Sequence, residues 1–422
     1  MKKTVVFILK ILSKLILFRY KPEVVGVTGS VGKTSTKMAI AEVLRGKFSV
    51  RASTGNYNTE TGVPLTIIGS QDPGRSVLAW ILVVFKALGL IVWKSDKYPQ
   101  ALVLEMAADR RGDIQYLAKL AKPRVGVITA VSAVHLEFFD DEHQVLKEKG
   151  SMLDYLKENG CAVLNIDDDK VASLMTKAKV KTVSYGMSDK AQLRAENIYV
   201  DKEHGGLNFK LSQDGSHVPV ILSRVLGKPG VYAALAASAV GIFYDMNLLQ
   251  IATRLKEVRP IPGRLQLLAG IKNTKIIDDT YNSSPLAVKA ALEVLMHLRC
   301  TGDKFAVLGD MLELGKKTEE LHKEVGEIVA SMGVDYLITV GERSTDTVMA
   351  AKEYGMNEDR IYSFDNVEEA GKFLQDKMQE GDLILIKGSQ GSRMEKIVKE
   401  VMAEPEKADE LLVRQYGDWL KT

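Results

Sequence analysis

The chain has 422 residues, of which 46% are hydrophobic and 26% are charged, and this length allows two or three domains that each bury a core. With 57 Lys and Arg against 54 Asp and Glu, the net charge is only +3, which argues against a protein whose main work is to coat nucleic acid. Cys161 and Cys300 form neither a zinc spacing nor a disulfide framework, which fits a reducing cytoplasm.

The first twenty residues contain five basic residues, no acidic residue and an apolar majority. Lys10 and Lys14 interrupt the apolar stretch, so neither a secretory signal nor a membrane-spanning helix fits it. On a helix, Lys3, Lys10 and Lys14 share one face. The other face collects Val5, Ile8, Leu9, Leu12, Leu15 and Ile16. We predict an amphipathic basic helix over residues 1–22, which either contacts an anionic membrane surface through residues 1–20 or packs on its own domain.

A second apolar stretch covers residues 76–93 and carries a single charge, at Lys86. Arg75 and Lys94 flank this stretch. We favour a buried or partner-packed helix here, and we keep an interfacial membrane helix as the alternative. A spanning helix fits least, because the segment lies between two parts of one predicted nucleotide site.

From Glu23 onward, short apolar runs alternate with stretches of helical periodicity, a pattern typical of a parallel sheet with helices on its faces. The apolar runs are 23–29, 101–107, 125–131 and 161–167, and the helical stretches include 36–44 and 145–156. Between residues 182 and 224, polar and apolar residues alternate, which predicts antiparallel hairpins joined to that sheet.

Pro260, Pro262 and Gly263 predict a stiff connector at residues 258–263. Beyond it, a second βα series has its apolar runs at 275–282, 304–311, 336–341, 360–364 and 382–389. The predicted fold is therefore α/β, with a phosphate-loop ATP-binding domain over residues 23–259 and a Rossmann-like, doubly wound domain over residues 260–422. The first domain has a mostly parallel sheet and carries the apolar helix 76–93 and the β-rich excursion 182–224. We predict a terminal helix after Pro405.

The strongest motif runs from Val24 to Ser35, where an apolar strand leads into a small-residue turn and then a helix. Backbone N–H groups and the helix N-terminus of such a loop cradle phosphates. Lys33 would neutralise the β- and γ-phosphates of ATP, and the Thr34 hydroxyl would hold Mg²⁺. The predicted nucleotide contacts are Gly29, Ser30, Val31, Gly32, Lys33, Thr34 and Ser35.

Other candidate site residues follow the predicted strands. Glu105 and His135 could complete a metal shell near the nucleotide, although a lone histidine is more often structural. Lys149, from its position alone, looks like a surface lysine on a helix. In the second domain, polar residues that suit a site shared across an interdomain cleft are Arg264, Asp278, Asp279, Asn282, Lys387 and Ser389.

The order of these motifs resembles the Mur ligase family, the ATP-dependent amide-bond-forming enzymes of peptidoglycan synthesis, from about Glu23 to Val401. The loop 28–34 matches the family's own phosphate loop, which lacks the first Gly of the general pattern. Four strings are most similar to the branch that joins D-alanyl-D-alanine to UDP-N-acetylmuramoyl-tripeptide. These strings are GNYNTETGVPLT at 55–66, PGRLQ at 262–266, DDTYNSSP at 278–285 and LGDMLELG at 308–315.

The resemblance implies that ATP phosphorylates the acceptor carboxylate and that the incoming amine attacks the acyl phosphate. It implies catalytic roles for Lys33, Glu105, His135 and Lys149, with Lys149 carbamylated. It also implies two Mg²⁺ ions held by Thr34, Glu105, His135 and Lys149. Arg264, Asn282 and Lys387 would contact the nucleotide when the C-terminal domain closes. The candidate substrate contacts are Asn56, Asn58, Asp279, Asp310 and Ser389.

The chain departs from the family pattern at three places, one of which is Ala107, where the family tends to have Gly. The usual amino-terminal uridine-nucleotide-binding domain has no counterpart before residue 23. Pro229, Gly230 and Ala233 stand where the family usually has a His-Asn pair and a later Asn. Acceptor recognition therefore stays open, and some polar contacts to the nucleotide must be replaced or lost.

Two other functions stay open at this point. One is a Mur-type ligase that acts on a different, membrane-linked carboxylate acceptor. The other is a membrane-associated, nucleotide-binding scaffold without catalysis, against which the retained metal-shell residues argue. We expect a cytoplasmic monomer with small-molecule substrates and no nucleic-acid partner, and the inner face of the membrane is the alternative location.

Overall fold

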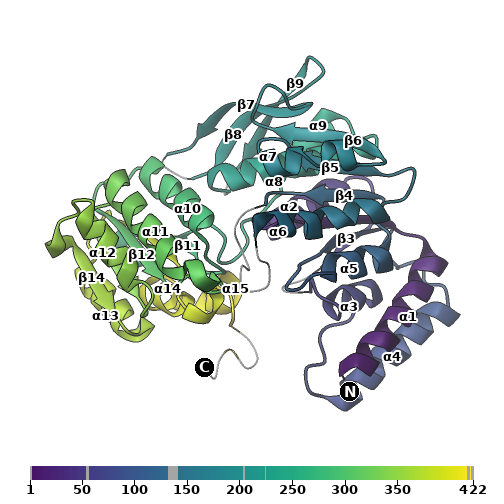
Figure 1. Cartoon of the computed structure of the whole chain (residues 1–422), viewed down its shortest axis with the longest axis horizontal. Coiled ribbons are helices and arrows are strands. Elements are labelled where there is room, and N and C mark those ends of the chain that lie inside the picture. Colours follow the sequence, from purple (N-terminus) through teal and green to yellow (C-terminus); the bar gives the residue numbers. More distant parts are fainter. Residues whose placement is uncertain are drawn as a thin grey trace.

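The computed structural model describes residues 2–53, 57–131, 141–202, 205–223, 225–415 and 419. These residues form two α/β parts, each built on its own sheet (Figure 1). The first part holds strands β1–β9 and the second holds strands β10–β15. The predicted α/β fold is confirmed, and the domain limits at residues 22 and 259 stay a prediction.

Nine strands form the first sheet, in the order β2-β3-β1-β4-β5-β6-β7-β8-β9. Their bounds are β1 Glu23–Thr28, β2 Val50–Ala52, β3 Ala101–Glu105, β4 Val125–Ile128, β5 Cys161–Asn165, β6 Lys181–Gly186, β7 Leu193–Val200, β8 Leu207–Gln213 and β9 Ser216–Leu222. Strands from β2 to β7 pair in parallel, whereas β7, β8 and β9 pair antiparallel. The predicted hairpins are present, but they begin after β6, which belongs to the parallel part.

Helices cover both faces of this sheet. On one face lie α2 Lys33–Leu44, α8 Gly227–Phe243 and α9 Leu248–Leu255. On the other lie α1 Lys2–Tyr20, α3 Gly62–Ile68, α4 Val77–Val92, α5 Asp113–Ala121, α6 Glu142–Gly150 and α7 Asp169–Ala172. In β1, Val25 and Val27 pack into the first core and Val24 into the second, because successive side chains of a strand point to opposite faces.

The second sheet has the order β10-β11-β15-β12-β13-β14, and only the edge strand β10 is antiparallel. Its strands are β10 Gln266–Ala269, β11 Lys275–Asp279, β12 Lys304–Gly309, β13 Tyr336–Val340, β14 Ile361–Phe364 and β15 Leu383–Lys387. One face is covered by α10 Pro285–His297, α11 Thr318–Met332 and α12 Thr345–Glu353, the other by α13 Val367–Lys377, α14 Glu395–Val401 and α15 Ala408–Leu411. This doubly wound arrangement confirms the predicted Rossmann-like second part.

Some predicted helices are shorter than their periodicity suggested. The stretch 145–156 holds the end of α6 and then a 3₁₀ helix, Ser151–Tyr155. The tail after Pro405 was wrongly predicted as one helix, because α15 ends at Leu411 and Arg414 has a positive φ of 61° that a helix does not allow. The remaining 3₁₀ helices are Met175–Lys177, Ile271–Asn273, Gly315–Lys317, Glu358–Arg360, Gln390–Ser392 and Pro405–Lys407.

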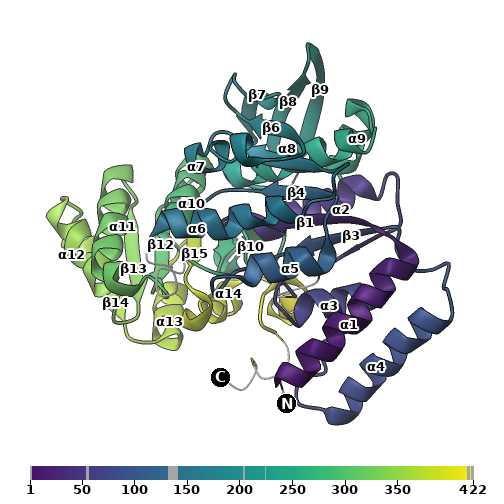
Figure 2. The same cartoon turned by 45° about the vertical axis from the view of Figure 1, so that its right-hand side comes forward.

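Helices α1 and α4 lie side by side at the edge of the first part (Figures 1 and 2). In α1, Leu9, Leu12 and Ile16 of the predicted apolar face are buried, whereas Ile8 and Leu15 of that face are exposed. Helix α4 was expected to be buried or packed against a partner, and within this chain only Val83 and Ala87 of its residues are buried. Within the described residues, no helix is long and apolar enough to cross a membrane.

Candidate functional site

The loop between β1 and α2 has the backbone of a phosphate cradle. Gly29 has φ 148°, and a Cβ there would lie 1.9 Å from Thr129 Oγ1, so only glycine fits. Gly32 has φ 83° and precedes α2, and no side chain caps that helix. The N–H groups of the first turn that lack a side-chain cap, together with the helix dipole, can therefore stabilise an anion at the loop.

Lys33 folds back over this loop. Its Nζ donates hydrogen bonds to Gly29 O at 2.8 Å and to Ser30 O at 3.3 Å. Burial lowers the pKa of Lys33, Glu105 opposes that shift, and the positive charge of Arg264 lowers the pKa further. A polyanion bound between Lys33 and Arg264 would offset the repulsion between these two cations.

Glu105, at the end of β3, is the centre of a buried polar cluster. Its Oε1 lies 3.3 Å from Thr34 Oγ1 and 3.2 Å from Asn58 Nδ2, and its Oε2 lies 3.1 Å from Lys37 Nζ. Burial alone would raise the pKa of Glu105, but the charges of Lys37 and Lys33 outweigh burial and hold the pKa below 4.5. The carboxylate is thus ionised beside a hydroxyl, and oxygen atoms of these two kinds are ligands that suit Mg²⁺.

Lys149 is a buried residue, contrary to the surface position that its sequence alone suggested. It is 2% exposed on α6, and within the described part of the chain no carboxylate forms an ion pair with it. The neighbouring Glu148 accepts hydrogen bonds from Gly112 N and Ile114 N instead. Burial and the nearby charge of Lys33 lower the pKa of Lys149 to about 7.

The second part contributes its own charged cluster at the ends of β11 and β15. Lys387 is buried, and its Nζ donates to Asp279 Oδ2 at 2.6 Å and to Asn282 O at 2.9 Å. Burial lowers the pKa of Lys387, and Asp279 opposes that shift. The guanidinium of Arg264 lies 3.9 Å from the centre of the Tyr281 ring, so a stacked aromatic fixes its direction.

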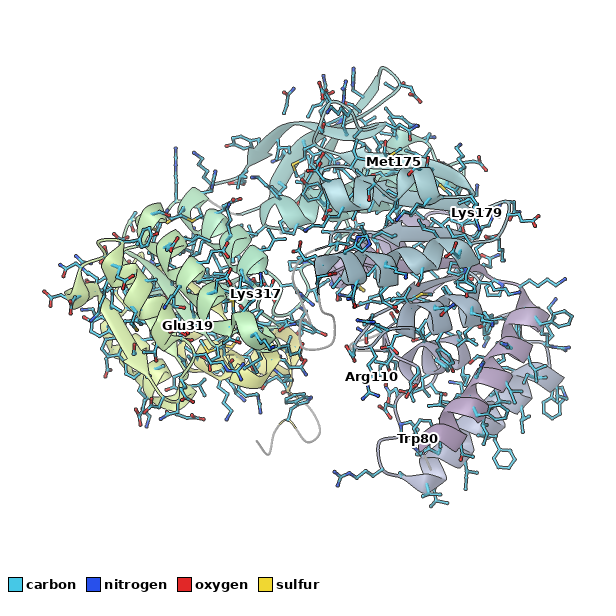
Figure 3. The ribbon with its side chains drawn as sticks, viewed as in Figure 1. Trp80, Arg110, Met175, Lys179, Lys317 and Glu319 are labelled. Atoms are coloured by element: carbon cyan, nitrogen blue, oxygen red, sulfur yellow. The ribbon has the colours of Figure 1, made fainter. Side chains whose placement is uncertain are left out.

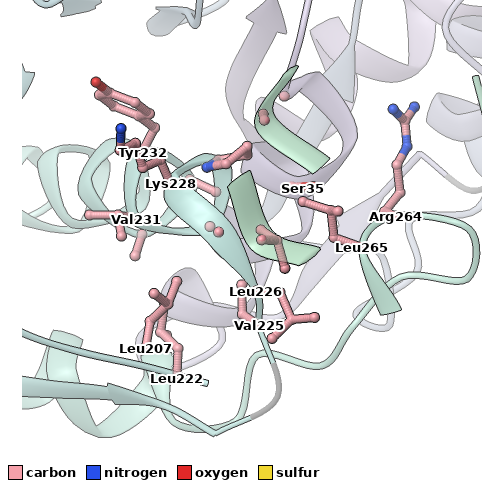
Figure 4. Close-up of a pocket in the computed structure, with 18 of the residues that line it drawn as sticks. Ser35, Leu207, Leu222, Val225, Leu226, Lys228, Val231, Tyr232, Arg264 and Leu265 are labelled. Carbon is pink, nitrogen blue, oxygen red and sulfur yellow. The ribbon is translucent and has the colours of Figure 1, made fainter. Parts of the chain in front are cut away.

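A cavity of about 860 Å³ separates the two charged regions. Figure 4 shows Ser35, Lys228, Tyr232 and Arg264 projecting around it. Residues from both parts line the cavity, among them Val31, Gly32, Ser35, Asn165, Asp167, Asp168, Tyr232, Arg264, Asp279 and Lys387. The arrangement can hold a phosphorylated ligand with its anionic end between two sets of cations.

Two predicted substrate residues lie together just after the carboxyl ends of the central strands β12 and β15. Asp310 accepts hydrogen bonds from Ser344 N at 2.9 Å and from Ser344 Oγ at 2.8 Å. Ser389 N donates to Asp310 O at 3.1 Å, and Ser389 Oγ accepts from Leu312 N at 2.8 Å. These contacts shape the loops after β12 and β15, and the substrate roles of both residues stay predictions.

His135 and Asn56 lie outside the described residues, so their placement stays a prediction. Among the described residues, no three His, Cys, Asp or Glu side chains gather into a metal site. The candidate magnesium donors that the structure brings together are one carboxylate, Glu105, and one hydroxyl, Thr34, while Asn58 turns its amide nitrogen toward Glu105.

Sequence reasoning missed three residues that contribute to this region. Lys37 pairs with Glu105, and its position one turn after Lys33 on the same helix face could have indicated this. Tyr232 donates a hydrogen bond to Asp167 Oδ2 at 3.0 Å, and both residues line the cavity. No short-range pattern connects Asp167 and Tyr232, which are 65 positions apart.

Family comparisons agree with this layout. The chain matches the Mur ligase middle domain at residues 27–79 and 90–241. It matches the Mur ligase glutamate ligase domain at residues 263–390. Together these matches cover most of the chain.

Whole proteins and solved structures give the same result. The chain is 30% identical to the UDP-N-acetylmuramoyl-tripeptide--D-alanyl-D-alanine ligase of Bacillus subtilis, over 93% of this chain and 79% of that protein. It is 29% identical to the Escherichia coli ligase of the same name, over 89% of this chain and 76% of that protein. The MurF ligase of Thermotoga maritima in complex with ADP aligns with a TM-score of 0.77 and 29% identity, over 95% of this chain and 84% of that chain. The chain therefore belongs to the Mur ligase family.

Proposed function

We propose that this chain is an ATP-dependent ligase that joins D-alanyl-D-alanine to UDP-N-acetylmuramoyl-tripeptide. One observation carries the proposal: the phosphate loop of the first part and the Arg264, Asp279 and Lys387 group of the second part line the same cavity. Relatives that carry this activity in their names align over most of the chain. They favour this acceptor over a membrane-linked carboxylate.

The site fits a reaction between two anions. The terminal phosphoryl group of ATP would move to the acceptor carboxylate, and the amine of the dipeptide would then attack the acyl phosphate and release phosphate. Lys33 and Arg264 would offset the negative charge of the reacting groups, which repel one another in a buried site. Lys387 would add positive charge from the second part.

The proposal includes Mg²⁺ at Glu105 and Thr34, whose oxygens lie 3.3 Å apart. When bound, the metal would supply positive charge that lowers the repulsion between phosphate and attacking oxygen. For a second ion, we propose His135 and a carbamylated Lys149. Burial of Lys149 away from any paired carboxylate among the described residues favours a neutral amine, which is the form that reacts with carbon dioxide.

We also propose that Asn58 and Asp279 act on the substrate side of the site, together with Asn56, Asp310 and Ser389, and that Asn282 contacts the nucleotide. The hydrogen bond from Asn58 Nδ2 to Glu105 supports the proposal for Asn58, because it places this side chain beside the proposed metal ligand. We further propose that the protein works as a monomer in the cytoplasm, and that residues 1–20 and 76–93 bring it to the inner face of the membrane.

The test is phosphate release by the purified chain with Mg-ATP, UDP-N-acetylmuramoyl-tripeptide and D-alanyl-D-alanine. We expect release only when both substrates are present, and loss of that release in Lys33→Met. Lys119→Met, an exposed lysine on α5, is the matched control and should keep full activity. Release that does not depend on the dipeptide, or that needs a different acceptor, would refute the proposed substrates.

A further inference from the structure

Exposed apolar side chains are concentrated on one region of the molecule. Among the described residues, thirteen of the twenty large hydrophobic side chains that are exposed belong to α1, α4 and the residue after α4. They are Phe7, Ile8, Ile11, Leu15, Phe18, Val77, Leu78, Ile81, Leu82, Phe85, Leu88, Val92 and Trp93. We call this set the α1–α4 face. Monomeric proteins scatter such residues singly, so a cluster of this size indicates a binding surface.

The cluster follows from helical geometry. In α1, the exposed positions 7, 8, 11, 15 and 18 fall on one side of the helix, opposite the buried Leu9, Leu12 and Ile16. In α4, exposed apolar residues occur in every turn, and Leu78 and Phe85 are 75% and 66% exposed. Both helices therefore have more apolar surface than their own domain covers.

The two helices form one unit. Arg19 Nη2 donates to Val92 O at 3.2 Å, and Tyr20 Oη donates to Leu90 O at 3.0 Å. The Tyr20 ring also stacks on Tyr98, with 4.0 Å between ring centres. Figure 3 shows Trp80 of α4 at the outer edge of the molecule, away from Lys317 and Glu319 of the second part. The α1–α4 face is thus held in a fixed arrangement at the periphery.

The charged side chains within the two helices are all basic, and the exposed acids Asp72 and Asp96 lie outside the helices, near Arg75 and Lys94. Neither α1 nor α4 contains an acidic residue. Lys14, Arg19 and Lys86 are exposed on the helices, and Arg75 and Lys94 are exposed at the two ends of α4. A second copy of the same face would bring these cations together with no carboxylate on either helix to pair with them. An anionic lipid surface would instead pair with them while it accepts the apolar side chains.

We propose that the α1–α4 face docks this protein onto a bilayer that contains anionic phospholipid. The apolar side chains would enter the boundary between headgroups and acyl chains, and the basic side chains would lie at the level of the headgroups. Trp93, 74% exposed next to Lys94, is the type of side chain found at such a boundary. The family match to the middle domain leaves out residues 80–89, so the middle of α4 is not part of the sequence pattern that the family shares.

Co-sedimentation of the full chain with vesicles tests the proposal. We expect the protein to bind vesicles of phosphatidylcholine mixed with phosphatidylglycerol, and to bind pure phosphatidylcholine vesicles more weakly. Leu82→Ser combined with Phe85→Ser should weaken binding by about a hundredfold or more, since each apolar side chain contributes about tenfold or more when buried. Lys14→Gln and Lys94→Gln should each weaken binding to the anionic vesicles by about fivefold.

A matched control replaces exposed apolar residues elsewhere, Leu249→Ser with Met349→Ser, and should leave vesicle binding unchanged. In a chain with Trp80→Phe and Trp419→Phe, the fluorescence of Trp93 should shift to shorter wavelength when the anionic vesicles are added. Ligase activity in solution should survive the Leu82→Ser, Phe85→Ser change, so vesicle binding is tested independently of the proposed ligase reaction, while it deepens the membrane location proposed for residues 1–20 and 76–93. No sedimentation of the wild-type chain, or equal sedimentation of both double variants, would overturn the proposal. The proposal would also be overturned if the wild-type chain did not bind vesicles and light scattering showed that it is a dimer. In that case Leu82→Ser with Phe85→Ser would convert the dimer to a monomer.

Discussion

Lys37 and Glu105 form a buried ion pair, with 3.1 Å between Nζ and Oε2. The other carboxylate oxygen of Glu105, Oε1, accepts hydrogen bonds from Thr34 and Asn58. One helix turn separates Lys37 from Lys33, so α2 presents one lysine to the phosphate loop and the next to the carboxylate behind it. Lys37 thus keeps Glu105 charged before any metal binds.

Replacing Lys37 with Met should leave the Glu105 carboxylate buried and unpaired. We expect the free energy of unfolding to fall by about 3–5 kcal/mol in urea titrations at neutral pH. Because Lys37 helps to hold the pKa of Glu105 below 4.5, the stabilising effect is present above that pH and is lost as the pH falls through the folded-state pKa. In the variant that loss, and the acid limb of the activity profile, should move to higher pH.

The double change Lys37→Met with Glu105→Gln serves as the control for this pair. It removes both charges, so stability should return toward the wild-type value while ligase activity stays low, since the proposed metal ligand is gone. Equal stability of wild type and Lys37→Met would show that the ion pair has no structural role.

The pH dependence of stability tests whether Lys149 is buried without a charged partner. Its pKa in the folded chain is lowered from 10.5 to about 7, so between these values the unfolded chain holds a proton that the folded chain does not. Stability should therefore rise with pH in that window, by at most about 1.4 kcal/mol per pH unit. Lys149→Met should flatten the rise, measured by urea titration in buffers depleted of carbon dioxide.

The same residue tests the proposed carbamate. Lys149→Ala should lose most ligase activity and regain part of it when short carboxylic acids are added, because they can supply the missing oxygen ligands. Lys147→Ala, two positions away on α6, is the control and should keep activity. Full activity of Lys149→Ala, or no response to added acids, would contradict the carbamate.

The sequence predicted the parallel strands and the phosphate loop well, because both are local patterns. Period-two burial places Val24 and Val25 on opposite faces, and the glycines at 29 and 32 accept the positive φ angles that the loop needs. The edge strand β10 was not anticipated, since Gln266–Ala269 is short and becomes a strand only through pairing with β11. Short strands of this kind depend on tertiary contacts more than on propensity.

The candidate site was less accessible to sequence reasoning. From its neighbours, Lys149 looked like a surface residue, and only the packing of α6 shows that it is buried. On α1, helical periodicity alone could not separate Leu12, which is buried, from Leu15, which is exposed, because the apolar residues cover more of the helix than the domain does. Contacts between distant segments decide both cases.

Gly29→Ala and Gly32→Ala form a matched pair for the phosphate loop. A Cβ at residue 29 would meet Thr129 Oγ1 at 1.9 Å, whereas a Cβ at residue 32 would meet nothing within 4 Å. Both changes strain a positive φ at a cost of about 1–2 kcal/mol, but only Gly29→Ala adds a collision. We expect Gly29→Ala to lose more stability and more ATP affinity, measured by thermal unfolding and calorimetry. If both variants behave alike, the collision with Thr129 has no role in shaping the loop.

Lys387 tests whether the second part contributes charge to the reaction. Lys387→Met removes the partner of Asp279, 2.6 Å away in the interior, and should destabilise the chain by about 3–5 kcal/mol. Adding Asp279→Asn removes the unpaired carboxylate, so the double variant should recover stability. Its activity should stay reduced by about a hundredfold or more, because the positive charge that we propose for the transferred phosphoryl group is missing. Single-turnover phosphate release from the folded double variant measures this directly. Activity that returns together with stability would limit Lys387 to holding β11 and β15 in place.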